Sequence, residues 1–169
     1  MSPIGHIAAA FAAKPAAPKV NIFVLLLSTL ILDFLFFFFA LVGLEGITKE
    51  ICWSHSLFMS VVWSIVFGLL GLLIYRDQRA GLVVGLLVFS HWFLDFVSHP
   101  MGFGHPLPPD MPLLFHGSRK VGLGLYNHIS VWEALLVETV MLIPAVAVYV
   151  MYILRQRRRR LSTTAASGG

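Results

Sequence analysis

The amino-acid sequence predicts an all-α integral membrane protein with four transmembrane helices and an N-terminal half-helix. Of its 169 residues, 58% are hydrophobic and only 12% are charged, whereas about a quarter of the residues in a soluble domain are charged. The mean hydropathy is +0.85. Four apolar runs approach the roughly 20 residues that a helix needs to cross the hydrocarbon core of a bilayer. A soluble globular class is therefore excluded.

Residues 1–154 are expected to form a single membrane domain. The spans are predicted at about residues 20–42, 56–75, 80–99 and 129–154, with an outer loop at 100–128. Before the first span, Ser2-Pro3 is typical of a helix start and Lys14-Pro15 of a helix end. The helix between them is too short to cross a bilayer, so we expect it to be interfacial or re-entrant.

The distribution of basic residues sets the expected orientation. Nine of the twelve Lys and Arg residues lie on one face of a four-span arrangement, five of them in the stretch RQRRRR that follows the last span. By the positive-inside rule, both termini are then cytoplasmic. Residues 155–169 are predicted to be a basic, flexible cytoplasmic tail that touches anionic membrane lipids. Lipid contact accounts for this charge, so no nucleic-acid partner is expected.

The segment SHWFLDFVSHP at the end of the third run places three ionisable residues in an apolar helix. His91, Asp95 and His99 lie at i, i+4 and i+8, so an α-helix aligns them on one stripe. An Asp at the centre of a span costs about 3 kcal/mol to insert, and such groups face other helices with partners. Candidate partners are Asp33 in the first run and His55 at the start of the second. The stripe is therefore expected to face the bundle interior.

His6 lies on the half-helix and is the most difficult of these residues to place. A cytoplasmic N-terminus puts His6 on the wrong side of the membrane unless the half-helix enters the bundle.

Three functions remain open for these polar residues. Imidazole and carboxylate groups together suit Zn²⁺, and also Mn²⁺ or Fe²⁺. Chains of Asp and His in spans also serve as proton or ion relays in transporters. Buried polar groups finally link helices in non-enzymatic scaffolds. The number of His and Asp residues on separate elements favours the metal site.

The order of these residues resembles a known family. His6, Asp33, Ser54-His55-Ser56 and His91-x-x-x-Asp95 follow the order seen in the bacterial inner-membrane metal-dependent hydrolases of the YdjM and YbcI type. The order is also similar to that of the zinc-dependent phospholipase C group. The similarity covers about residues 1–100, and the second Asp of the family's Pro-Asp-x-Asp motif is replaced here by Leu35. The resemblance implies a divalent metal, hydrolysis of a phosphoester or lipid head group, and a bacterial inner-membrane location.

Roles are assigned to residues on this basis. The main metal ligands are expected to be His55, His91 and Asp95, with Asp33 and His6 next and His99 as a further candidate. A carboxylate that is not a ligand, Asp33 or Asp110, acts as the base. The proline- and glycine-rich loop is interpreted as a lid or substrate loop. Its expected substrate-binding residues are Arg119, Lys120, His116 and His128. Gly81 and Gly85 form a small-xxx-small pair that packs helices within a chain or in a homo-oligomer.

Overall fold

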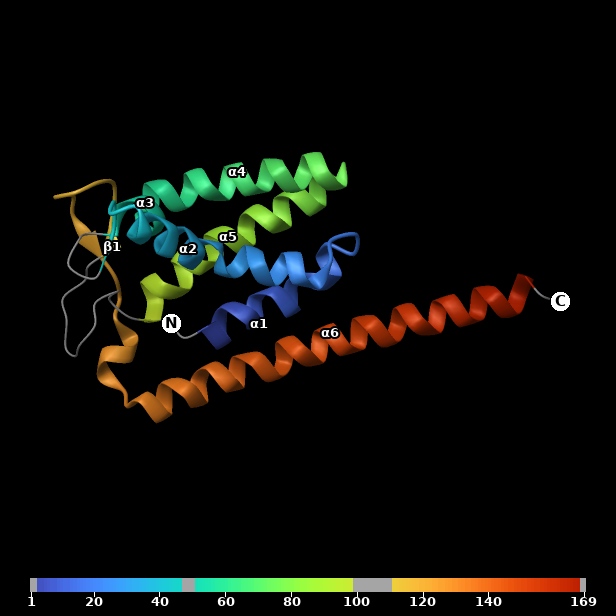
Figure 1. The fold of residues 1–169 in the computed structure, drawn as a ribbon. Helices are drawn as coiled ribbons and strands as arrows, with labels where there is room; N and C mark the ends of the chain where they lie inside the picture. The colour runs from blue at the N-terminus through green and yellow to red at the C-terminus, as the bar shows by residue number, and fades with distance from the viewer. Residues whose placement is uncertain (1–2, 47–50, 99–110, 168–169) are drawn as a thin grey trace.

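The computed structural model describes residues 3–46, 51–98 and 111–167 and confirms an all-α membrane fold (Figure 1). Four helices are long and apolar enough to cross a membrane: α2 (Ile22–Leu41), α4 (Leu57–Tyr75), α5 (Gln78–Ser98) and α6 (Val131–Ser167). The half-helix is α1 (Pro3–Ala13), and it is followed by the 3₁₀ turn η1 (Lys14–Ala16). The short elements are α3 (Cys52–His55), β1 (Met111–Pro112), β2 (Lys120–Val121) and η2 (Leu125–His128).

The bundle has two chemically different ends. The turns between α1 and α2 and between α4 and α5 lie together at one end, where Lys19 Nζ is 2.7 Å from Asp77 Oδ2. We call this the basic end, and we call the opposite end, which carries residues 42–46, α3 and the 111–128 segment, the loop end. The Lys19 ammonium group, by hydrogen bonding, lowers the pKa of Asp77.

Two of the predicted span starts are fixed by side-chain caps. The Asn21 side chain accepts a hydrogen bond from Phe23 N at the start of α2. Ser56 accepts one from Met59 N at 3.1 Å, as its position before the second apolar run predicts. These bonds satisfy backbone donors that have no partner inside the helix.

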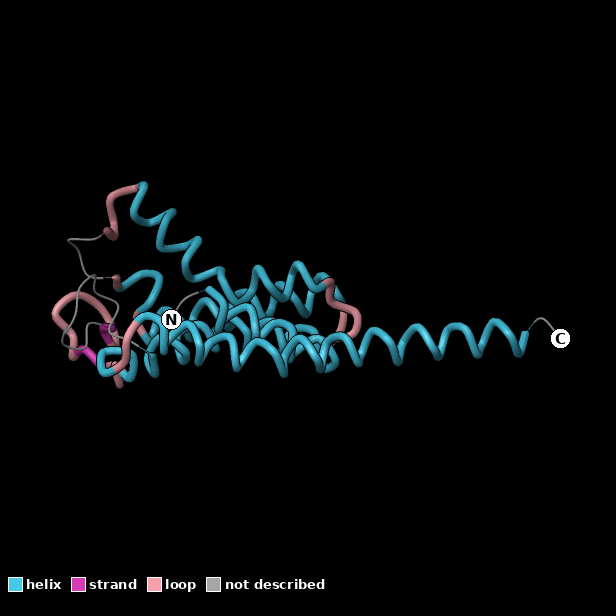
Figure 2. The backbone as a smooth tube through the Cα atoms, turned by 90° about the horizontal axis from the view of Figure 1, so that it is seen from below, coloured by secondary structure: helices cyan, strands magenta, loops and turns pink. Residues whose placement is uncertain are grey.

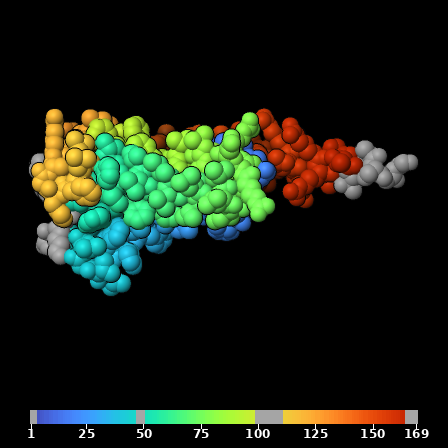
Figure 3. Space-filling view, turned by 90° about the horizontal axis from the view of Figure 1, so that it is seen from above, coloured from blue at the N-terminus to red at the C-terminus, as the bar shows by residue number. Residues whose placement is uncertain are grey.

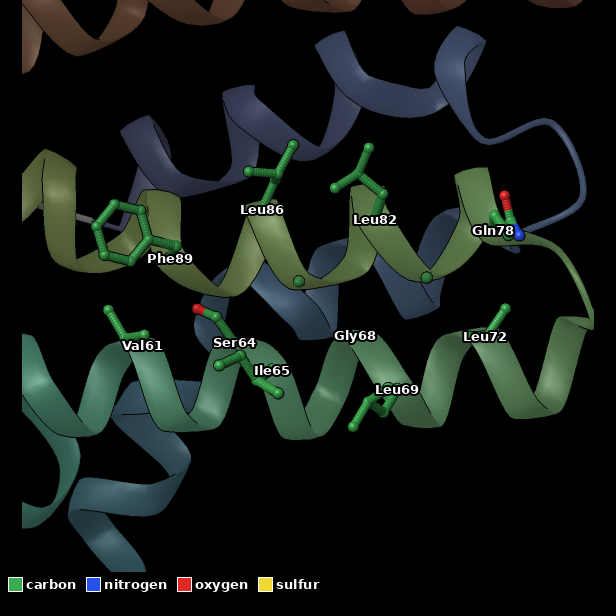
Figure 4. A pocket seen from close by; sticks show the side chains of 12 residues that line it. Val61, Ser64, Ile65, Gly68, Leu69, Leu72, Gln78, Leu82, Leu86 and Phe89 are labelled. Carbon is green, nitrogen blue, oxygen red and sulfur yellow. The ribbon is translucent and has the colours of Figure 1, made fainter.

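Helices α4 and α5 form a close hairpin through glycine. A Cβ atom on Gly81 would lie 2.8 Å from the carbonyl oxygen of Gly68, and one on Gly85 would lie 2.8 Å from that of Ser64. The predicted small-residue contact is therefore made within the chain. An apolar groove of about 540 Å³ runs along this seam, where Gly68, Gly81 and Gly85 have no side chains (Figure 4).

The half-helix α1 packs against α2, α5 and α6. Phe11 contacts the Tyr149 ring of α6 at a centroid distance of 5.2 Å. Lys14 ends α1 as predicted, and its ammonium group donates to the carbonyl oxygens of Pro18 and Val20. Burial lowers the pKa of Lys14. The half-helix is thus part of the bundle, with its N-terminal end directed away from the basic end (Figure 1).

The predicted flexible tail is helical instead. α6 continues without a break through Ser167 and extends past the basic end of the other helices (Figure 1). Arg, Gln, Leu and Ala all favour helix, and RQRRRRLSTTAAS contains no glycine or proline. A charged composition indicates that this segment is exposed, but it does not indicate that the helix ends.

The 111–128 segment covers the loop end of α4 and α5. β1 and β2 pair antiparallel, with Met111 opposite Val121. Leu113 O accepts from Phe58 N at 3.0 Å, and Leu123 N donates to Phe96 O at 2.7 Å. Met111 is fully buried in one core cluster with Leu32, Val88 and Trp92. This part of the predicted loop is therefore anchored to the helices.

Candidate functional site

Five ionisable side chains from four helices meet in the loop-end half of the bundle. They are His6 of α1, Asp33 of α2, His55 of α3, and His91 and Asp95 of α5. His91 and Asp95 lie one turn apart on the buried face of α5, as the i, i+4 spacing predicts. The structure thus brings together residues that are separated by up to 89 positions in the sequence.

His91 Nε2 is the centre of the cluster. It lies 3.2 Å from His55 Nε2, 3.4 Å from Asp33 Oδ1 and 3.1 Å from Asp95 Oδ2. His55 Nε2 is 3.7 Å from Asp33 Oδ1. On the other side, His6 Nε2 is 3.4 Å from Asp95 Oδ1, and the His6 ring stacks on the His91 ring at a centroid distance of 4.0 Å.

The tautomer of the neutral His91 ring follows from its outer partner. His91 Nδ1 lies 2.6 Å from the carbonyl oxygen of Thr29. A carbonyl oxygen only accepts hydrogen bonds, so Nδ1 carries the proton and donates it. The lone pair of the neutral ring is then on Nε2, which points into the cluster.

The neutral His55 ring is held in the same tautomer by hydrogen bonds that run from His55 through Ser54 to Glu45. Ser54 Oγ donates to Glu45 Oε2 at 2.7 Å, which uses the only hydroxyl proton. His55 Nδ1, at 2.7 Å from Ser54 Oγ, must therefore be the donor in that bond. Glu45 also accepts from the backbone N–H groups of Trp53 and Ser54. His55 thus also presents the lone pair of Nε2 to the cluster.

In the neutral rings, the two imidazole lone pairs face each other at 3.2 Å and repel unless a proton or a metal ion lies between them. Asp33 Oδ1, His55 Nε2 and His91 Nε2 are separated by 3.2–3.7 Å. Ligands at 2.0–2.1 Å from a tetrahedral zinc ion are about 3.3 Å apart. The three donor atoms therefore fit one face of a zinc coordination tetrahedron, with the fourth position left for another ligand.

The remaining pair, His6 and Asp95, fits the metal less well. These two form a second possible group of ligands with His91. However, within the described part of the chain His6 Nδ1 has no hydrogen-bond partner. Histidine ligands of metals almost always donate from their other ring nitrogen, as His55 and His91 do here.

The position of His6 depends on how α1 enters the bundle. Lys14 and Lys19 stay at the basic end, while the helix between Pro3 and Ala13 runs inward to the level of His91 and Asp95. The apolar residues Ala8 and Ala10 line its buried face and allow close packing. This arrangement satisfies the condition under which His6 was expected to join the site.

The other predicted site residues do not join this cluster in the described structure. Arg119 is exposed and lines a separate hollow with Leu57 and Val61 of α4. The side chains of His116, Lys120 and His128 are also exposed, on the 111–128 segment. His99 and Asp110 lie outside the described residues.

Three residues that orient the histidines of the cluster were not identified from the sequence. Glu45 follows α2 in an irregular segment, Ser54 was noted only as part of a motif, and Thr29 contributes a backbone carbonyl oxygen. The one sequence signal for Glu45 is a carboxylate on the short connection between two apolar runs. In the structure Glu45 is 2% exposed.

Comparisons with known proteins give no further assignment. A scan against protein-family models, a search of curated proteins and a search of solved structures each returned no match.

Proposed function

We propose that this protein is a membrane-embedded, metal-dependent hydrolase. The observation that carries the proposal is the set of three donor atoms on Asp33, His55 and His91, with spacings that suit zinc and with both rings oriented by outer acceptors. Three protein ligands with an open fourth position are typical of catalytic rather than structural zinc sites. Mn²⁺ or Fe²⁺ also suits this mixture of nitrogen and oxygen donors.

The geometry supports an exchange of roles between the two aspartates. In this proposal Asp33, predicted as the base or as a further ligand, is a ligand, because Asp33 Oδ1 lies beside both oriented imidazoles. When bound, a divalent metal supplies a Lewis acid and a bound water of lowered pKa. Asp95, which was predicted as a ligand, would be placed to accept a proton from the attacking water.

The His6 and Asp95 pair is suited to hold a proton. Asp95 Oδ2 lies 3.1 Å from His91 Nε2, so this carboxylate borders the place where the three ligands converge. Its other oxygen faces His6 Nε2 at 3.4 Å. A proton taken up by Asp95 can therefore be shared with His6 and returned to the leaving group.

The resemblance to YdjM- and YbcI-type hydrolases supports the same reaction class, because its motif residues are the members of the cluster. It also supports a bacterial inner-membrane location, and the basic residues support cytoplasmic placement of the basic end. A phosphoester or lipid head group is the substrate class that this resemblance suggests. Arg119 and Lys120 are proposed to contact its anionic part from the loop end.

A transporter relay receives less support from the packing. Between the cluster and the basic end, the described core contains the apolar side chains Leu25, Val84 and Leu87. A proton relay requires polar groups that continue through the span. The buried hydroxyl groups of this region, on Ser28 and Thr29, donate to carbonyl oxygens of their own helix, so they do not extend the cluster towards the basic end.

Elemental analysis of the protein purified in detergent without chelator tests the proposal. Wild-type protein should contain about one bound divalent metal, and His91→Ala should contain far less while remaining folded. Ser64→Ala is the matched control, because Ser64 Oγ bonds only to the Ser60 carbonyl oxygen of its own helix at 2.7 Å. A folded wild-type protein that binds neither Zn²⁺ nor Mn²⁺ on addition would exclude the hydrolase.

A further inference from the structure

The candidate site is closed on most sides and open at one. The side chains of His6, His55, His91 and Asp95 are each 3% exposed or less. The Asp33 side chain is 41% exposed. Asp33 is thus the member of the cluster through which a substrate reaches the other four.

The described residues at the loop end do not provide this access. Ser54, Ser56 and Met111 are completely buried, and Glu45 is 2% exposed. These residues belong to the connection after α2, to α3 and the residue that follows it, and to β1, which packs against α3. The opening at Asp33 is instead on the flank of α2.

The flank around Asp33 is strongly apolar. Phe37 and Leu41 continue the Asp33 stripe at i+4 and i+8 and are 67% and 86% exposed. Phe34, beside them, is 54% exposed. Asp33 lies eight residues before Leu41, which is about 12 Å along the helix axis. The opening therefore faces the depth of the hydrocarbon core.

The arrangement of the helices explains this opening. α1 has 11 residues and is about 16 Å long, which is roughly half the length of α2. It starts near His91, so it does not cover the loop-end half of α2. This part of α2 leans away from the other helices (Figure 2) and protrudes from the surface together with residues 42–46 (Figure 3).

We propose that the site is entered sideways from the bilayer and that its substrate is a long-chain membrane lipid. The hydrolysable linkage reaches the cluster at Asp33, and the hydrocarbon chain lies along the exposed phenylalanine side chains of α2. This assignment rests on the proposed function for the reaction, but the route of entry does not depend on turnover.

Spin labels test the route without any substrate. In a Cys52→Ala background, which removes the only native cysteine, Leu30→Cys and Phe37→Cys place labels on either side of Asp33 and leave all five cluster residues intact. In proteoliposomes, both labels should collide more often with oxygen than with a water-soluble nickel chelate. Leu69→Cys on the exposed face of α4 should match them, and Arg119→Cys should show the reverse preference. Collision with the nickel chelate at positions 30 and 37 as frequent as at position 119 would overturn sideways entry.

Metal-binding amphiphiles test the class of ligand. Protein loaded with Co²⁺ in lipid nanodiscs is titrated with acetohydroxamate, butanohydroxamate and octanohydroxamate, and the visible spectrum of the metal is followed. If the ligand enters from the bilayer, each added methylene should lower the total hydroxamate concentration needed for half-saturation about fourfold. Equal half-saturation across the series would exclude a lipid substrate. Failure to bind Co²⁺ would reject the hydrolase itself, and the spin labels would still decide the route.

Discussion

Removal of one hydroxyl group, in Ser54→Ala, tests whether His55 is held for metal binding. Ser54 Oγ accepts from His55 Nδ1 and donates to Glu45 Oε2, both at 2.7 Å. The substitution removes this link but keeps the backbone N–H bonds from Trp53 and Ser54 to Glu45. Because Ser54 is completely buried, water does not readily replace the lost oxygen.

The expected loss follows from the role of the outer partner. Replacing groups that orient a metal-bound histidine costs 10- to 100-fold in metal affinity, which corresponds to about 1.4–2.8 kcal/mol. In the metal-free protein, His55 Nδ1 is also left as a buried donor without an acceptor, at a cost of about 1–3 kcal/mol. Ser54→Ala should therefore bind zinc 10- to 100-fold more weakly and also unfold at a lower temperature.

Zinc affinity is measured by competition with a chromogenic chelator in detergent. Ser64→Ala serves as the control, because it also removes a 2.7 Å serine hydrogen bond, but from the middle of α4. It should bind zinc like the wild type. If folded Ser54→Ala binds zinc within about twofold of the wild type, the Glu45–Ser54 chain does not orient a ligand and the metal assignment of His55 is wrong.

Three further outcomes are expected. Gly81→Val should destabilise the α4–α5 hairpin by about 1–3 kcal/mol through overpacking, since its Cβ would lie 2.8 Å from Gly68 O. Unfolding in a denaturing detergent measures this loss of stability. The control Leu82→Val, at an exposed position, should change the stability little. Asp77→Ala should lower the thermal midpoint more than Asp77→Asn, because only the alanine variant loses the bonds from Arg79 N and Ala80 N. Since Lys19 lowers the pKa of Asp77, their mutual stabilisation should be present above about pH 3.9 and be lost as the pH falls through the lowered pKa; Asp77→Asn should remove this acid step. Bound metal should be retained at about pH 8 and released towards about pH 5, because histidine binds metal only when deprotonated; elemental analysis after dialysis measures this, and retention at the lower pH would contradict histidine ligation.

The elements that the sequence predicted are those with a strong periodic or compositional signal. α2, α4 and α5 lie within two residues of the predicted spans because apolar runs of this length have few alternatives. His91 and Asp95 were placed on one buried stripe by helical spacing alone. Both inferences depend only on residues that are close together in the sequence, and helix formation fixes how such residues are arranged.

The parts that the sequence did not predict depend on contacts between distant segments. No periodic pattern connects Glu45 to His55, since the chain between them turns back after α2 to form α3. The depth of His6 follows from the packing of α1 against α6 and α5, which composition does not encode. The helical continuation of α6 beyond Leu154 was also not predicted, because the last span was placed by its apolar run, whereas the charged residues that follow also favour helix.

The short length of α1 also has a consequence for biosynthesis. His6 leaves the ribosome before its partner Asp95, which follows 89 residues later. At ordinary elongation rates this delay is roughly 5–18 s. During that time α1 cannot span the membrane by itself, and α5 and α6, against which it packs, have yet to be made. α1 should therefore wait at the membrane surface and enter the bundle after α5 and α6, so that the cluster is completed only once α6 has been inserted.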